Sequence, residues 1–232
     1  GLYAGGAKIS GGADVKKEGE VRMIRADNVS LILNKRQILS HISLELHNGK
    51  IYGLVGNNGC GKTMLMKCIC GFVHPTEGKI EADGKVIGKD VDYLPDAGII
   101  IETPGFIGYY SGLQNLKVLA GIRHKIGQEK IRNTMCTVGL DPDLKLPVKK
   151  YSLGMRQRLG LAQAIMEEPS VLILDEPMNG LDRRGVEEIR SLLLSLKARN
   201  KLIVIASHNA EDIKVLCDRV YEMDNGIIQK SN

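Results

Sequence analysis

The sequence predicts an α/β fold with a mixed sheet, a helical insert and an antiparallel β edge. Residues 51–55 form a short apolar run that leads through a glycine-rich loop into a helical segment at 62–70. A second apolar run, 171–174, ends in two adjacent carboxylates, and residues 21–46 alternate apolar and polar side chains. Short apolar strands between helices are typical of a parallel sheet, whereas the alternating runs favour antiparallel pairing.

The first elements follow from periodicity and turn residues. Residues 21–46 predict two strands joined by a turn at 34–36, and Gly78, Gly84 and Gly88 punctuate a hairpin-like region. Residues 99–101 predict another apolar strand. A helical insert over about 105–165 follows, with apolar residues at helical spacing, Gly139 as a stop and Ser152 as the cap of a third helix that runs to 166.

The last third of the chain alternates strands and helices. Residues 171–174 and 202–206 predict buried strands, while 185–197 and 210–216 predict helices. The closing residues predict a hairpin that turns at 224–226, because Asn-Gly is the strongest short hairpin signal.

Length and composition favour one large domain. The chain has 232 residues, of which 43% are hydrophobic, and we expect the domain to span 21–232. Residues 1–20 lack a signal peptide's apolar stretch and are expected to be a tag remnant or a disordered leader. No apolar run reaches the length of about 18 residues that spans a bilayer, so any membrane role would depend on partners.

Charge and cysteine content suggest no further specialised site. The net charge of +5 is spread out and is expected to reflect an ordinary solvated surface. Binding of an anionic ligand or a membrane surface is the alternative interpretation, and no nucleic-acid partner is expected. The five cysteines are odd in number and lack a CxxC pair, so they predict neither a disulfide framework nor a zinc site but a reducing cytosol.

Residues 56–63 carry the strongest chemical signal. They fit the pattern GxxxxGK(S/T) and lie between a buried strand and a helix, which predicts a P-loop nucleotide hydrolase using ATP and Mg²⁺. Backbone N–H groups and the helix dipole would cradle phosphates, Lys62 would reach the β and γ phosphates, and the Thr63 hydroxyl would ligate Mg²⁺. The residues expected to contact the nucleotide here are Gly56, Asn57, Asn58, Gly59, Cys60, Gly61, Lys62, Thr63 and Met64.

The two carboxylates after 171–174 predict the rest of the hydrolytic centre. They come at a strand's end, where ligands bind in α/β sheets. Asp175 is expected to hold the Mg²⁺ shell, and Glu176 to act as the general base on the attacking water.

The segment Tyr-Ser-Leu-Gly-Met-Arg-Gln-Arg at 151–158 resembles the LSGGQ signature of ABC ATPases. Ser152 and Gly154 match, whereas Leu153 and Met155 replace the middle glycine and the glutamine. The YSLGM form of this segment is similar to the signature motif in the exporters of bacitracin and lantibiotic peptides. Asn-Gly-Leu-Asp at 179–182 resembles the D-loop, and His208 resembles the switch histidine that contacts the γ phosphate.

The resemblance covers roughly residues 22–228 and implies a motor. It implies two such domains packed head to tail, with ATP between the phosphate loop of one and Ser152 and Gly154 of the other. Asp182 of the D-loop is also expected to contact the nucleotide. It also implies transmembrane permease subunits, a place on the cytoplasmic face of the membrane, and export of a peptide or antibiotic. Whether the second domain is identical or a paralogue stays open.

Three positions depart from the family pattern. Glu102 stands where a Q-loop glutamine is usual, as in the E-loop of lantibiotic exporters, and could meet Mg²⁺ while adding negative charge. Leu33 falls where an aromatic residue usually stacks on adenine, which predicts looser nucleotide selectivity. Cys60 within the phosphate loop predicts sensitivity to alkylation.

The partner surface and two alternative functions complete the expectations. Phe106, Tyr109 and Tyr110 are candidates for permease contact, although core packing is an equal possibility. A soluble ABC protein acting on ribosomes or DNA is one alternative, but a single phosphate loop and no heptad run argue against it. A catalytically silent nucleotide sensor is the other, and the intact Lys62, Asp175, Glu176 and His208 argue against that.

Overall fold

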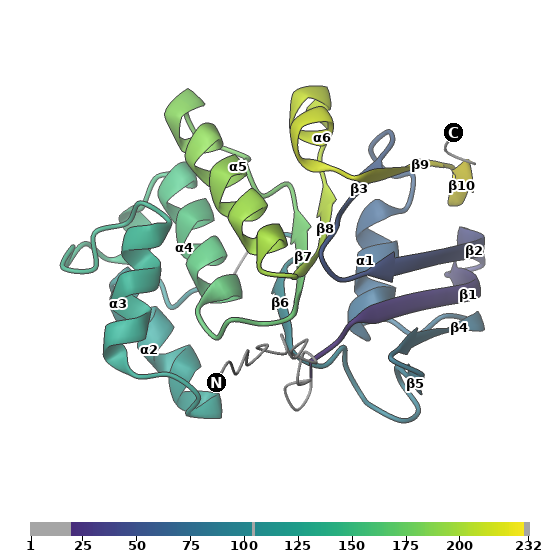
Figure 1. Cartoon of the computed structure of the whole chain (residues 1–232), viewed down its shortest axis with the longest axis horizontal. Helices are drawn as coiled ribbons and strands as arrows, with labels where there is room; N and C mark the ends of the chain where they lie inside the picture. The colour runs from purple at the N-terminus through teal and green to yellow at the C-terminus, as the bar shows by residue number, and fades with distance from the viewer. Residues whose placement is uncertain (1–19, 104, 230–232) are drawn as a thin grey trace, which may run out of the picture.

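The computed structural model describes residues 20–103 and 105–229, which form two sheets and six α-helices (Figure 1). The predicted leader over 1–20 lies outside the described residues except for Glu20. Within the described part, no helix is long and apolar enough to cross a bilayer.

The first sheet is antiparallel and has the strand order β2-β1-β4-β5. Its first turn is shorter than predicted, since Asn34 and Lys35 alone make it, with φ of 48° and 63°. Arg36 already belongs to the second strand, because two left-handed residues suffice to reverse an antiparallel pair. The strands are β1 Met23–Leu33, β2 Arg36–His47, β4 Glu77–Ala82 and β5 Lys85–Val86.

The second sheet has the order β10-β9-β3-β8-β7-β6 and is mixed, as predicted, since β10 alone runs antiparallel to its neighbour. Its central strands are buried on both faces, which explains their continuous apolar runs. Its strands are β3 Ile51–Val55, β6 Ala97–Ile100, β7 Val171–Asp175, β8 Leu202–Ala206, β9 Arg219–Asp224 and β10 Ile227–Gln229.

Alternate side chains of the central strands enter two different cores. Ile173 and Val204 pack into a core shared with the first sheet and α1 (Lys62–Cys70), so this helix lies between the two sheets. Leu172 and Ile203 point the other way, into a core shared with the remaining helices. Those helices are α2 Gly112–Arg123, α3 Gln128–Thr137, α4 Leu153–Ile165, α5 Arg183–Ala198 and α6 Ala210–Leu216.

The helical insert and the preceding strand differ from prediction in extent. α-Helix covers 112–123, 128–137 and 153–165, while 138–152 is irregular apart from a 3₁₀ turn at Val148–Lys150. Pro142 and Pro147 interrupt this stretch, because proline lacks the N–H that a helix interior requires. The strand predicted at 99–101 is β6, which begins at Ala97 and ends before Ile101.

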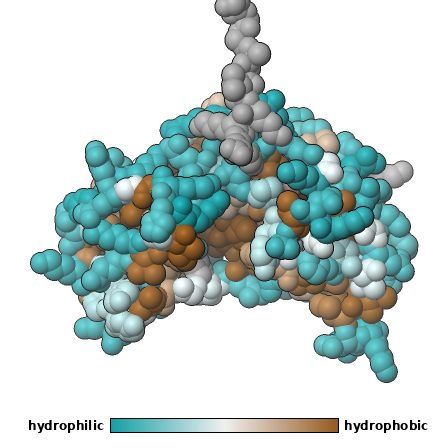
Figure 2. Space-filling model, turned by 90° about the horizontal axis from the view of Figure 1, so that it is seen from below, coloured by the Kyte–Doolittle hydropathy of each residue, from teal (hydrophilic) through white to brown (hydrophobic). Residues whose placement is uncertain are grey.

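Figure 2 shows one face of the molecule, hollowed between the helical side and the β-rich side. Hydrophobic side chains gather in this central hollow and at one corner of the β-rich side. Apolar surface gathered in a concavity is a feature of faces that receive partners.

The parallel strands of the second sheet end at a common edge, and this edge positions the site. Leu54 and Asp175 both pair with Ala206, and Ile100 pairs with Leu174. The segments that follow β3, β6, β7 and β8 therefore emerge side by side. In open α/β sheets this carboxyl edge is where ligands bind.

Candidate functional site

The phosphate loop joins β3 to α1 in a backbone conformation that needs glycine. Gly56 has φ of 146°, and a Cβ there would lie 2.2 Å from the carbonyl oxygen of Met223. Lys62 Nζ donates to the carbonyl oxygens of Gly56 at 2.7 Å and Asn57 at 3.1 Å, so its ammonium group lies within the curve of the loop. Gly61 caps α1 without a side-chain hydrogen bond, which leaves the first amides of the helix for an anion.

Thr63 and Asp175 meet although 112 residues separate them. Thr63 Oγ1 donates to Asp175 Oδ2 at 2.9 Å, from the first turn of α1 to the last residue of β7. One hydroxyl and one carboxylate oxygen are hard donors, the kind that Mg²⁺ prefers. These two side chains could therefore hold Mg²⁺ together, as the sequence predicts for both.

Glu176 and His208 also meet, one residue beyond β7 and two beyond β8. His208 Nδ1 lies 3.0 Å from Glu176 Oε1, and the backbone N–H of His208 donates to the same oxygen at 3.1 Å. Glu176 adopts φ of 47°, a strained conformation for a residue with a side chain. Such strain is typical of functional sites. Gln157 Nε2 donates to the Glu176 carbonyl at 3.1 Å and holds that turn from α4.

Glu102 is paired with a cation that sequence reasoning missed. Lys67 Nζ lies 2.6 Å from Glu102 Oε1, and Lys67 is on the face of α1 one turn after Thr63. Residues at i and i+4 of a helix share a face, so the side chains of Thr63 and Lys67 project from the same side of α1. The added negative charge of Glu102 is thus partly balanced within the chain.

Most of the predicted residues line one of two clefts on either side of the loop. The first cleft, of about 540 Å³, is lined by Asn58, Gly59, Gly61, Lys62, Thr63, Met64, Glu102, Asp175 and Glu176 among others. The second, of about 820 Å³, is lined by Gly56, Asn57, Asn58 and His208 among others. Cys60 lines neither, because its thiol is buried under the loop, 3.7 Å from Lys62 Nζ.

Ser152, Gly154 and Asp182 line neither cleft. Ser152 Oγ caps α4 by accepting from Met155 N at 3.1 Å, and Asp182 caps α5 by accepting from Gly185 N at 2.8 Å. A Cβ on Gly154 would lie 2.7 Å from the Gly180 carbonyl oxygen, so the signature segment packs directly on the D-loop. These three residues therefore cap and pack their own segments, although Leu153 and Asn179 of the same segments line the first cleft.

Several lining residues escaped the sequence reasoning. Ile38 contributes an apolar wall to the first cleft from β2, whereas Leu33, the residue expected near the base, is not among the lining residues. The expectation for Leu33 came from the family pattern, whereas strand alternation in the β1–β2 hairpin was the available signal for Ile38. Thr103, Leu153, Arg156, Gln157 and Asn179 also line it.

Comparison with protein families and curated sequences finds similarity to ABC transporter proteins. A family described as "ABC transporter" matches residues 39–179. The chain is 41% identical over 209 residues to YybJ, an uncharacterised ABC transporter ATP-binding protein of Bacillus subtilis (strain 168), which covers 90% of this chain and 96% of YybJ. It is 39% identical to the bacitracin transport ATP-binding protein BcrA of Enterococcus faecalis, over 88% of this chain and 67% of BcrA. It is 37% identical to the lantibiotic transport ATP-binding protein SrtF of Streptococcus pyogenes, over 84% of each.

Solved structures share the fold. The structure of an ATP-binding subunit of an ABC transporter superimposes with a TM-score of 0.81 at 22% identity, over 90% of this chain and 89% of the other. A dimeric ATP-binding cassette in a post-hydrolysis state bound to ADP and Pi gives a TM-score of 0.81 at 19% identity, over 90% and 97%. The α/β fold with its helical insert is therefore that of these cassettes.

Proposed function

Because the chain belongs to the ABC transporter family, we propose that it is the ATP-hydrolysing motor subunit of a transporter. One observation carries the proposal: the pairs Thr63–Asp175 and Glu176–His208 form at the same sheet edge as the phosphate loop. A nucleotide-binding module without hydrolysis needs the loop but not a carboxylate oriented by a histidine. A hydrolase also needs a group that positions or activates the attacking water, and the Glu176–His208 pair fits that role.

The residues divide the work of hydrolysis between them. Lys62 would exchange its two loop carbonyl partners for phosphate oxygens, and the free amides at the start of α1 would bind the same anion. Thr63 and Asp175 would hold Mg²⁺, which when bound neutralises developing phosphate charge. Glu176 would accept a proton from the attacking water, while His208 would orient the Glu176 carboxylate and contact the γ phosphate.

Dimerisation is supported by three residues that line neither cleft of their own chain. Ser152 at an exposed helix N-cap, with Gly154 and Asp182, would complete the site of a second cassette packed head to tail. Their absence from the lining of both clefts supports action on another copy, identical or paralogous. A dimeric cassette with ADP and Pi among the fold's relatives agrees with this arrangement.

The membrane partners and the cargo rest on the relatives. BcrA and SrtF are named as bacitracin and lantibiotic transport proteins, so we propose export of a peptide or antibiotic through separate permease subunits. The cassette would then act on the cytoplasmic face of the membrane. The hollowed face with gathered hydrophobic side chains supports a docked partner (Figure 2). Tyr109 is 71% exposed and is, independently of that view, our candidate contact.

The test is Mg²⁺-dependent ATP hydrolysis by the chain at several protein concentrations, with Glu176→Gln beside it. A rate that rises faster than linearly with concentration and falls at least about 100-fold in the variant supports a dimeric motor with Glu176 as base. Nucleotide binding without hydrolysis, both alone and after reconstitution with permease subunits, would overturn the proposal in favour of a nucleotide sensor.

A further inference from the structure

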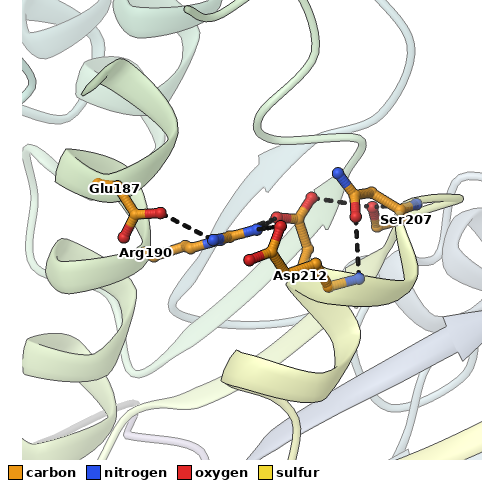
Figure 3. Close-up of polar contacts among 6 residues, drawn as sticks. Glu187, Arg190, Ser207 and Asp212 are labelled. Carbon is orange, nitrogen blue, oxygen red and sulfur yellow. Dashed lines mark hydrogen bonds and ion pairs between the residues drawn. The ribbon is translucent and has the colours of Figure 1, made fainter. Parts of the chain in front are cut away.

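Arg190 and Asp212 form a buried ion pair that joins α5 to α6 (Figure 3). Arg190 Nε and Nη2 donate to Asp212 Oδ1 at 2.9 and 2.6 Å. The two side chains are 6% and 3% exposed, which makes this the most buried of the ion pairs in the described part of the chain. Burying two charges is costly, and apolar residues of similar size often replace such a pair without loss of stability. A role besides stability is therefore worth seeking.

The two carboxylate oxygens of Asp212 accept hydrogen bonds from different residues. Oδ1 takes both N–H groups of Arg190, while Oδ2 accepts from Ser207 Oγ at 3.4 Å. Figure 3 shows Arg190, Asp212 and Ser207 in a line that runs from α5 across α6 to the end of β8. Because both Arg190 contacts go to Oδ1, the arginine holds that oxygen and leaves Oδ2 to accept from Ser207.

Ser207 links Asp212 to the backbone that flanks His208. Its Oγ accepts from the backbone N–H of Asn209 at 3.1 Å, and Asn209 Oδ1 accepts from Glu211 N at 2.9 Å as the cap of α6. Ser207 and Asn209 are the two neighbours of His208. The backbone of His208 is thus held by polar contacts whose far end is Arg190.

His208 depends on its backbone for its position. Its side chain is 74% exposed, so packing does little to hold the ring. Its ring and its backbone N–H nevertheless both meet Glu176 Oε1, at 3.0 and 3.1 Å. A shift of the segment 207–209 would therefore move two hydrogen-bond donors away from the Glu176 carboxylate.

We infer that Arg190 is a positioning residue, which acts through Asp212 and Ser207 to hold His208 against the Glu176 carboxylate. The inference rests on the proposed function, since that function makes Glu176 and His208 the hydrolytic pair. Arg190 touches none of the residues that line the first cleft, so its effect should fall on turnover and not on nucleotide affinity.

The sharp test replaces both charges with apolar side chains of similar size, in Arg190→Met/Asp212→Leu. This double variant should fold and melt near the wild type, because no unpaired buried charge remains. It nevertheless lacks the acceptor for Ser207. We expect kcat for ATP hydrolysis to fall about tenfold or more with nucleotide Kd within about twofold, since small misplacements of catalytic groups reduce turnover strongly.

A second variant and a control separate positioning from stability. Ser207→Ala keeps the ion pair and removes only the link to the segment 207–209, and it should reproduce the loss in kcat. Ile189→Val, one residue from Arg190 on α5 and fully buried, perturbs the core without touching the network and should keep wild-type kcat. If the double variant keeps both the stability and the kcat of the wild type, Arg190 serves stability alone and the inference fails.

Amide hydrogen exchange gives a readout that needs no activity. In the double variant and in Ser207→Ala, amides in 207–213 should exchange faster while those of β3 and β7 stay protected, whereas Ile189→Val should leave 207–213 unchanged. Unchanged exchange over 207–213 in both variants would overturn the inference. A wild-type chain that hydrolyses no ATP, both alone and after reconstitution with permease subunits, would instead refute the proposed function, with the exchange result still deciding whether Arg190 positions His208.

Discussion

Lys67 Nζ lies 2.6 Å from Glu102 Oε1, which brings a cation to the residue that replaces the usual Q-loop glutamine. Lys67 is 25% and Glu102 64% exposed, so the pair is partly screened by solvent. Glu102 lines the same cleft as Thr63 and Asp175, and Lys67 lies one helical turn after Thr63 on α1. A substitution of either Lys67 or Glu102 would therefore change the net charge at this end of the cleft.

We expect substitutions in this pair to shift the Mg²⁺ dependence of hydrolysis in opposite directions. Glu102→Gln removes a negative charge and should raise the half-saturating Mg²⁺ concentration about two- to fivefold, while Lys67→Met should lower it by a similar factor. Titration of the ATPase rate with Mg²⁺ measures both. Arg132→Met, which breaks the exposed pair between Arg132 on α3 and Asp143, is the control and should change nothing. A shift in the same direction for both variants would contradict the charge argument.

Thr63→Val should separate metal binding from nucleotide binding. The change keeps the shape of the side chain but removes the hydroxyl that donates to Asp175 Oδ2. We expect hydrolysis to fall about 100-fold or more and Mg²⁺ to stop enhancing nucleotide affinity, since one of two hard oxygen ligands is lost. Nucleotide titrations with Mg²⁺ and with EDTA check this. Thr137→Val, which removes a hydroxyl bonded to the Asn133 carbonyl, should behave as wild type.

Gly154→Ala should disturb two loops at once. The new Cβ would lie 2.7 Å from the Gly180 carbonyl oxygen, so the signature segment or the D-loop must move. We expect a loss of about 1–3 kcal/mol in unfolding free energy and a larger fractional loss of hydrolysis. Gly121→Ala in α2 meets nothing within 4 Å and should stabilise the chain by up to about 1 kcal/mol without changing hydrolysis. Wild-type stability and activity in Gly154→Ala would mean that the two loops do not constrain each other.

The cysteines should alkylate in an order set by burial. Cys136 is exposed and should react first with iodoacetamide, without loss of activity. Burial raises the pKa of Cys68 to about 11, and the pKa values of Cys70 and Cys217 to about 12, so few of these thiols are ionised at neutral pH. Buried Cys60 should react slowly, with inactivation that follows its modification, because its thiol contacts Lys62. Mass spectrometry of timed samples tests the order, and inactivation that tracks Cys136 would contradict it.

The aromatic residues of segment 105–110 should divide into a structural and a contact group. Phe106 packs partly against the helical core, so Phe106→Ala should cost about 1–2 kcal/mol of unfolding free energy. Tyr109 is exposed and meets Tyr110 edge to face at 4.9 Å, so Tyr109→Ala should leave the melting temperature and the isolated ATPase unchanged. In a reconstituted transporter, Tyr109→Ala should lower transport per ATP hydrolysed. Unchanged coupling would remove Tyr109 from the partner surface.

Much of the fold could be predicted because its signals are local. The continuous apolar runs of β3, β7 and β8 and the hairpin turn before β10 were predicted from periodicity and turn residues, and the structure confirms them. Boundaries were less certain. The strand expected at 99–101 begins at Ala97, and 138–152 is not helical, because proline positions and packing against neighbouring elements decide where an element ends.

The sequence by itself determined the strand–loop–helix motif, the acidic strand end and the order of the family motifs, because periodicity and motif spacing are properties of neighbouring residues. Only the tertiary structure decided that Thr63 meets Asp175, that Lys67 balances Glu102, and that Ile38 lines the cleft. It also decided that Arg190 reaches Asp212, 22 residues away, and through it Ser207. Such contacts depend on strand order, register and side-chain direction, which neighbouring residues alone do not set.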